Sequence, residues 1–216
     1  MMELLVKISE ALQKGKAKDV KAMVQEAIDL GLEPQMILNE GLLSGMNEVG
    51  IKFKNNEVYV PDVLIAARAM KAGTELLKPL LVAGGIKAKG KVVIGTVKGD
   101  LHDIGKNLVA MMMEGQGLEI IDAGTDVAPE RFVELAKEND AQIIACSALL
   151  TTTMGEMKSV IEAATAAGIR ENVVIMVGGA PVNDTFAKTI GADIYTPDAA
   201  SAAEEAIAAL KVKGIA

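Results

Sequence analysis

Hydrophobic residues in the first part of the chain recur every three or four positions, which is the spacing of helices that bury one face. Leu4, Leu5, Ile8 and Leu12 follow this spacing, and three later segments repeat it. The four helices are predicted over residues 4–12, 20–28, 34–46 and 61–77. Because the connections between them are short, the pattern predicts a helical bundle over residues 1–83.

The pattern changes after residues 84–90, a glycine- and lysine-rich stretch without apolar periodicity that is the predicted linker. Beyond it, short apolar runs of the buried-strand type alternate with helical segments. Strands are predicted over residues 92–97, 118–121, 142–146, 173–177 and 193–195, and helices over 104–115, 129–138, 154–167, 182–189 and 198–210. This alternation predicts an α/β domain over residues 91–216, a doubly wound five-stranded parallel sheet of the Rossmann or flavodoxin-like type.

Composition and charge exclude several classes of protein. The formal net charge is -7 and no Lys/Arg cluster is interleaved with aromatic residues, so no nucleic acid is expected as a partner. No segment approaches the about 20 apolar residues of a membrane span, so no membrane partner is expected, and the N-terminus does not read as a signal peptide. Cys146, the single cysteine, lies in an apolar run and is predicted to be a core residue. A cytoplasmic location suits these features.

The candidate chemistry lies in the loops after the first, third and fourth predicted strands, because open α/β sheets bind ligands at the carboxyl ends of their strands. The first of these loops contains His102, the only histidine of the chain, two residues after Asp100. An imidazole can ligate a metal through one nitrogen while a carboxylate accepts the N–H of the other. Gly105 would let the following helix approach a bulky ligand. The alternative is an ordinary loop histidine beside a helix-capping Asp103.

The residues required for other common kinds of functional site are missing from the sequence. One histidine and one cysteine cannot build a zinc or iron site, which needs about three or four protein ligands. A nucleophile elbow, a dinucleotide fingerprint and a phosphate-binding P-loop are all absent from the sequence. Any metal must therefore bring most of its own ligands, as a macrocyclic cofactor does, and leave one axial position for His102.

Three motifs carry a resemblance to a known family. Residues 100–105 match the pattern D-x-H-x-x-G, Ser147 to Leu149 match S-x-L, and Gly178 and Gly179 match a glycine pair after the fourth strand. The chain resembles the cobalamin-binding domains of methionine synthase, of base-off mutases and of the corrinoid proteins of methyl-transfer systems. The resemblance implies a cobalamin cofactor bound base-off, with His102 replacing the lower nucleotide as the cobalt ligand.

The resemblance also implies roles for the other loop residues. Thr153 would be a relay hydroxyl beneath Asp100, although the three threonines at 151–153 could instead cap the following helix. A deep slot would take the nucleotide tail, with backbone access at the glycine pair. The remaining residues of the implied cofactor site are Asp103, Ile104, Gly105, Ser147, Leu149, Thr151, Gly178, Gly179 and Ala180.

The N-terminal bundle is similar to the cap domain of methionine synthase and of small methyltransferase corrinoid proteins. Tyr59 would shield the upper face of the cofactor, or would be an ordinary bundle residue. The resemblance implies a methyl carrier without turnover of its own, most similar to the methylamine type. Its implied partners are a substrate-specific methyltransferase, an acceptor methyltransferase acting on tetrahydrofolate or a thiol, and a reductive activase.

Three alternatives to a methyl carrier remain open. A subunit of an adenosylcobalamin-dependent mutase would use the same sheet domain, but the N-terminal bundle argues against it. A B12 photoreceptor would need a DNA-binding domain, for which 216 residues leave no room. A flavodoxin-like module without a corrinoid is the third alternative.

Overall fold

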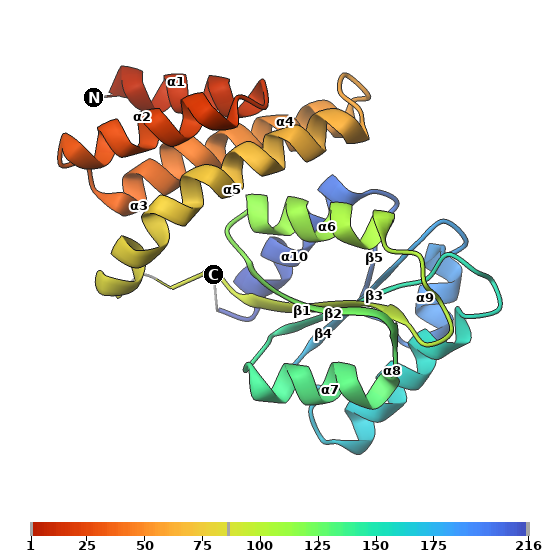
Figure 1. The fold of residues 1–216 in the computed structure, drawn as a ribbon. Helices are drawn as coiled ribbons and strands as arrows, with labels where there is room; N and C mark the ends of the chain where they lie inside the picture. The colour runs from red at the N-terminus through yellow and green to blue at the C-terminus, as the bar shows by residue number, and fades with distance from the viewer. Residues whose placement is uncertain (1, 86, 215–216) are drawn as a thin grey trace. The chain divides into compact units, whose positions relative to one another are not determined.

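The computed structural model describes residues 2–85 and 87–214, which form two compact units (Figure 1). One unit contains the residues up to 88 together with 115–117, and the other contains residues 89–114 and those from 118 onward. Position 86 of the predicted linker and the terminal positions 1, 215 and 216 lie outside the described residues. Among the helices of the described residues, none is long and apolar enough to cross a membrane.

In the part that the structure describes, the first unit consists of helices and the turns between them. The helices are α1 (Met2–Gln13), α2 (Ala17–Asp29), α3 (Pro34–Met36), the π-helical η1 (Ile37–Leu43), α4 (Ser44–Lys54) and α5 (Val60–Ala83). α3, η1 and α4 follow one another without a break, so the unit consists of four helical rods, as predicted. The third rod was predicted to end near residue 46 but continues to Lys54, because Val49 extends its buried face. Leu5, Ile8, Leu12 and Leu77 are buried in the core of this unit.

The second unit is an all-parallel sheet with the strand order β2-β1-β3-β4-β5. Its strands are β1 (Lys91–Val97), β2 (Glu119–Val127), β3 (Ile143–Ser147), β4 (Val174–Gly178) and β5 (Ile194–Tyr195). Its helices are α6 (Ile104–Gly115), α7 (Pro129–Glu138), α8 (Gly155–Ala166), α9 (Asp184–Ile190) and α10 (Ala199–Val212). The predicted fold class is confirmed, and the strand order reverses between β1 and β3.

Helices cover both faces of this sheet, which is why its central strands are continuous apolar runs. α7 and α8 lie on one face and α6 and α10 on the other (Figure 1). On the α7 and α8 face, Phe132 and Val160 join Val93, Ile144 and Ile175 of the strands in one buried cluster. Because the strands are held from both sides, the loops at their carboxyl ends start from fixed positions.

The edge strand β2 is longer than the sequence predicted. The prediction ended at residue 121, but the strand continues to Val127 through a polar stretch that has no apolar pattern. A strand at the edge of a sheet can be half exposed, and most of β2 is only partly buried. Its pairing with β1 is irregular, since Ile94 pairs with Asp122 but Val97 pairs with Val127. The extension lies beside the loop that follows β1.

Candidate cofactor site

Three loops come together at the carboxyl edge of the sheet, around the point where the strand order reverses. They follow β1, β3 and β4, which are neighbours or next neighbours in the sheet, and span residues 98–103, 148–154 and 179–183. Doubly wound sheets bind their ligands at this position. These are the three loops in which the sequence predicted the cofactor site.

Asp100 orients the imidazole of His102. The Nδ1 atom of His102 lies 2.7 Å from Oδ1 of Asp100, and the backbone N–H of His102 donates to the same oxygen at 3.1 Å. Because an ionised carboxylate can only accept hydrogen bonds, we assign the ring proton to Nδ1, which leaves the lone pair on Nε2. The His102 side chain is 51% exposed, whereas that of Asp100 is fully buried. The loop therefore presents the Nε2 atom of one oriented imidazole to a metal.

The other oxygen of Asp100 is bound by the loop after β3. The backbone N–H groups of Leu149 and Leu150 donate to Oδ2 at 2.8 and 3.1 Å. Burial raises the pKa of Asp100, but the hydrogen bonds from the His102 ring and from these backbone groups outweigh it and hold the pKa well below its usual range. Asp100 is thus a charged group in a buried place, fixed from two loops at once.

Thr153 lies between Asp100 and a backbone carbonyl. Its buried hydroxyl is 2.9 Å from Oδ2 of Asp100 and 2.9 Å from the carbonyl oxygen of Leu150. A hydroxyl has one proton, so Thr153 donates to one of these oxygens at a time. The predicted pairing of Thr153 with Asp100 is therefore present as a contact, together with a second acceptor that the sequence did not indicate.

Gly179 allows the loops after β3 and β4 to touch. Its φ is +130°, and a Cβ there would lie 1.9 Å from the carbonyl oxygen of Ala148, so no other residue fits without a backbone shift. The Ala148 N–H donates to the carbonyl oxygen of Gly178 at 3.2 Å, and Ser147 pairs with Gly178 in the sheet. A Cβ at Gly178 would meet no atom within 4 Å, so open space lies beside this backbone.

Large apolar side chains are exposed around the histidine. Leu101 is 73% exposed and Ile104 76%, and Leu149 and Leu150 are exposed at 43% and 41%. Three of these side chains lie on the two adjoining loops and Ile104 lies at the start of α6, and burying them against an apolar ligand would be favourable. A Cβ at Gly105 would meet no atom within 4 Å, which leaves room in front of the first turn of α6.

The donor set fits a metal that brings its own equatorial ligands. Among the described residues, no group of three or more His, Cys, Asp or Glu side chains could hold a metal ion. Cys146 is buried, and burial raises its pKa to about 12, so it is not a thiolate ligand at neutral pH. A single oriented imidazole next to exposed aliphatic side chains would suit a metal that a large macrocycle already holds and that needs one protein ligand.

The remaining predicted residues lie apart from the Asp100 contacts. Thr151 and Ala180 are exposed on their loops, and Asp103 is exposed and accepts a hydrogen bond from the Asn107 side chain at 3.1 Å. Tyr59 belongs to the helical unit, where its backbone N–H donates to Asp62 at 2.9 Å at the start of α5. Its side chain is 66% exposed.

Four residues that contact the His102 loop or its helix were missed from the sequence. The Thr96 hydroxyl donates to the carbonyl oxygen of His102 at 2.8 Å. Asp126 accepts from the backbone N–H of Gly99 at 2.7 Å, and Lys106 of α6 binds Asp122 at 2.6 Å. Extending the second predicted strand beyond residue 121 would have placed both aspartates next to this loop.

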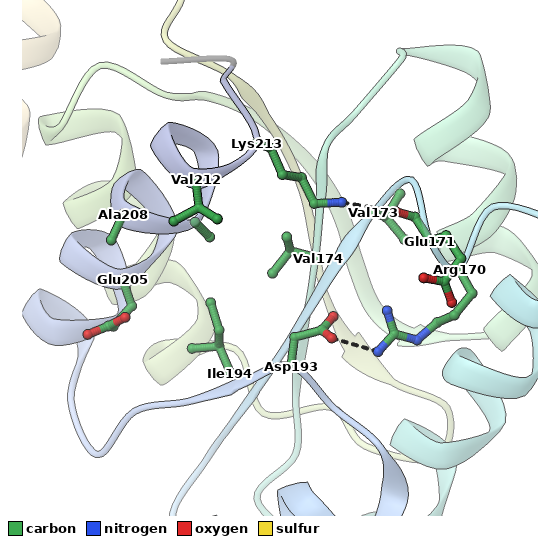
Figure 2. Close-up of a pocket in the computed structure, with 11 residues that line it drawn as sticks. Arg170, Glu171, Val173, Val174, Asp193, Ile194, Glu205, Ala208, Val212 and Lys213 are labelled. Atoms are coloured by element: carbon green, nitrogen blue, oxygen red, sulfur yellow. Dashed lines mark hydrogen bonds and ion pairs between the residues drawn. The ribbon is translucent and has the colours of Figure 1, made fainter.

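A pocket of about 490 Å³ lies at the opposite, amino-terminal edge of the sheet, between the starts of β4 and β5 and helix α10 (Figure 2). Its two cationic side chains are engaged within the pocket wall. Arg170 binds Asp193 at 2.7 Å, and Lys213 donates to the carbonyl oxygen of Glu171 at 3.1 Å. None of the predicted cofactor-site residues lines this pocket, so it is separate from the loops described above.

Comparisons with known proteins identify the family of both units. A family model described as a B12 binding domain matches residues 90–210, and a second model with the same description matches residues 4–78. The chain is 44% identical over 205 residues to the dimethylamine corrinoid protein of Methanosarcina barkeri, covering 94% of this chain and 96% of that protein. It is 41% identical over 212 residues to trimethylamine corrinoid protein 2 of Methanosarcina mazei, covering 97% of each.

The fold is also found in solved structures. A chain in the crystal structure of the methanol:cobalamin methyltransferase complex MtaBC from Methanosarcina barkeri superposes with a TM-score of 0.88 at 31% identity. The superposition covers 97% of this chain and 80% of that chain. Both the helical unit and the sheet unit thus have counterparts in proteins of known cofactor chemistry.

Proposed function

This chain belongs to the corrinoid proteins with B12-binding domains, and from that membership we propose that it carries methyl groups between two methyltransferases with His102 as the cobalt ligand. The membership confirms the family and the cofactor, cobalamin, that the sequence predicted. When bound, the corrinoid supplies a cobalt atom that accepts and releases the methyl group.

The contact between His102 and Asp100 carries the proposal. Because Asp100 holds the proton on Nδ1, the lone pair of Nε2 would be free to hold the cobalt. His102 would then stand in place of the cofactor's own nucleotide base, which is the base-off and His-on state. Thr153, which reaches the other oxygen of Asp100, would couple ligation to the position of a proton.

The exposed backbone beside β3 and β4 supports a place for the nucleotide tail. We assign Ser147, Thr151, Gly178, Gly179 and Ala180 to its slot, because open space adjoins Gly178 and Gly179 keeps the two loops together. The other assigned cofactor contacts, nearer the histidine, are Asp103, Ile104, Gly105 and Leu149. Exclusion of water from the exposed aliphatic side chains would add to the affinity for the macrocycle.

We propose a substrate-specific methyltransferase as the donor partner and a second methyltransferase, acting on tetrahydrofolate or a thiol, as the acceptor partner. The relatives named for dimethylamine and trimethylamine favour a methylamine as the methyl source. The likeness to the MtaBC complex favours direct docking with a methyltransferase. A reductive activase and a cytoplasmic location complete the proposal.

The helical unit is proposed to be a cap. Residues 1–83 would shield the methyl-bearing face, with Tyr59 exposed to contact it, and residues 84–90 would let the cap move aside for partner enzymes. A mutase subunit is not favoured as the alternative, because the relatives that match this chain over nearly its whole length are named dimethylamine and trimethylamine corrinoid proteins.

The test uses the fact that His102 is the only histidine. Protein labelled with ¹⁵N-histidine is loaded with cobalamin, reduced to the Co(II) form and measured by electron paramagnetic resonance. An axial ¹⁵N nucleus splits each cobalt line into a doublet, the ¹⁴N of the cofactor's own base gives a triplet, and no axial nitrogen leaves single lines. We expect the doublet, and we expect single lines with cobalamin still bound in His102→Ala. A triplet in the labelled wild type would refute His102 as the ligand.

A transfer assay tests the carrier role separately. Protein loaded with methylcobalamin should lose its methyl group to tetrahydrofolate or to a thiol only when the matching acceptor methyltransferase is added. Turnover with adenosylcobalamin and a mutase substrate would instead support the alternative.

A further inference from the structure

We infer that the carboxyl half of β2, residues 122–126, is a second brace of the His102 loop and that Asp126 is its positioning residue. The inference rests on His102 as the cobalt ligand and adds a group that does not touch the histidine. The loop is bound on its other side by the Asp100 contacts to residues 149, 150 and 153. Without a second brace, those contacts would fix one side only.

Asp126 holds the start of the loop through two hydrogen bonds. Its Oδ1 accepts from the backbone N–H of Gly99 at 2.7 Å, and its own backbone N–H donates to the carbonyl oxygen of Asp100 at 2.9 Å. Asp126 thus binds the backbone on either side of the peptide bond that joins Gly99 to Asp100. A shift of this peptide would move the carboxylate that orients His102.

Asp122 holds the end of the loop through α6. Both of its oxygens accept from the Lys106 ammonium group, at 2.6 and 2.7 Å, and Oδ1 also accepts from the backbone N–H of Gly124 at 2.9 Å. The Lys106 side chain is only 2% exposed, so the ion pair is partly shielded from water and fixes the first turn of α6. The histidine therefore lies between two points that β2 fixes.

The irregular pairing of β2 with β1 makes this possible. Between the pairs Ile94 with Asp122 and Val97 with Val127, β2 contains two more residues than β1. Asp126 has a φ of +54°, a left-handed conformation that aspartate, asparagine and glycine tolerate better than most residues. Bulges of this kind redirect side chains next to functional sites.

Substitutions at Asp126 distinguish the role of its carboxylate from the role of its backbone N–H. Asp126→Gly keeps the backbone N–H and suits the positive φ, but removes the acceptor for Gly99. Asp126→Asn keeps both an acceptor and the tolerance of that conformation. The matched control is Asp140→Gly. Asp140 is also exposed and has a φ of +51°, but it lies in the turn before β3, at the amino-terminal ends of the strands and away from the His102 loop.

The variants are compared as full-length ¹⁵N-histidine protein loaded with cobalamin in the Co(II) form. We expect Asp126→Gly to convert part of the doublet into single lines and to raise the Kd for cobalamin roughly threefold to tenfold. Asp126→Asn and Asp140→Gly should keep the doublet of the wild type. A change of overall stability alone would not alter the line pattern of the folded, loaded protein.

The outcomes distinguish a failure of the proposed brace from a failure of His102 as the cobalt ligand. An unchanged doublet in Asp126→Gly, with single lines in His102→Ala, would overturn the brace and leave the ligand assignment intact. A wild type without a doublet would overturn the ligand assignment itself. If Asp126→Gly does not fold, Asp122→Asn decides, because it weakens the hold on Lys106 at the other end of the brace. If Asp122→Asn loses part of the doublet, the brace is supported. If it keeps the doublet of the wild type, the brace is overturned.

Discussion

At the carboxyl edge of the sheet, the loop after β1 is held mainly by side-chain hydrogen bonds, whereas the loops after β3 and β4 are held by direct backbone contact. On the His102 side, charged and hydroxyl side chains make the contacts, and the single carboxylate of Asp100 accepts hydrogen bonds from two loops. On the side of β3 and β4, the backbones meet directly because Gly179 has no side chain. The first side should therefore respond to changes of charge and hydrogen-bonding capacity, and the second to any added atom.

The largest effect is expected from Gly179→Ala. Its Cβ would lie 1.9 Å from the carbonyl oxygen of Ala148, at a φ of +130°, so the two loops must separate. We expect a loss of about 3 kcal/mol or more in the free energy of unfolding, from overpacking and backbone strain together. Cobalamin binding should fall with it. Urea unfolding and a cobalamin titration measure the two effects.

The control for this prediction is Gly168→Ala. Gly168 also has a positive φ, +70°, but a Cβ there would meet no atom within 4 Å, so only backbone strain of about 1 kcal/mol is expected. Equal losses in the two variants would show that close approach at Gly179 does not matter, which would remove the contrast between the two sides.

An intermediate effect is expected from Asp100→Asn. The amide has one oxygen for the five donors that the carboxylate now serves, so at least one buried donor loses its acceptor. We expect the variant to lose about 2–3 kcal/mol in the free energy of unfolding at pH 7. Urea unfolding over a series of pH values provides the measurement.

The pH dependence of that loss has a definite sign. The pKa of Asp100 is lower in the folded protein than the unfolded value of about 3.9, so its contribution is complete above that value and is lost as the pH falls toward the folded pKa. The difference between wild type and Asp100→Asn should therefore be constant above about pH 5 and narrow below pH 4. A difference that stays constant down to pH 3 would contradict the depressed pKa. Asp140→Asn, on the exposed surface, should show neither effect.

The smallest effect is expected from Thr153→Val. The variant keeps the branched shape but removes a hydroxyl that is one of several partners of Asp100, so about 1 kcal/mol should be lost. Thr153→Ser retains the hydroxyl and should lose clearly less from this hydrogen bond, apart from the cost of the missing methyl group. If Thr153→Ser loses as much as Thr153→Val, packing and not hydrogen bonding is the role of this residue. Thermal unfolding of the three proteins resolves differences of this size.

The sequence predicted those parts of the molecule that have a repeating pattern. The four helical rods and the central strands were found because each has an apolar face or an apolar run of the expected period. β2 was cut short at residue 121 because an exposed edge strand with Asp122 and Asp126 has no such pattern. The third rod was cut short near residue 46 for a similar reason, since Val49 and Gly50 are the buried residues of α4 beyond Met46 and give little apolar pattern.

At the candidate site, the sequence indicated side chains but not their backbone partners. The resemblance to cobalamin-binding domains brought Asp100, His102 and Thr153 into one hypothesis, and the distances of 2.7 and 2.9 Å link them in the structure. The hydrogen bonds from residues 149 and 150 depend on loop conformation, which no spacing rule gives. Thr96 appeared only as part of an apolar strand, although its hydroxyl reaches the His102 carbonyl.

The partners of Asp100 also determine when the site can form during folding. Leu149 and Thr153 are 49 and 53 positions away along the chain, so the buried carboxylate gains its donors only after β3 has docked beside β1. Contacts between such distant segments form late, because a long loop must first be closed. A chain with β3 undocked has no oriented imidazole to offer, so cobalamin should bind the folded sheet and favour it by mass action. Cells short of cobalamin would then hold a larger unfolded fraction of this protein, which would be open to proteolysis.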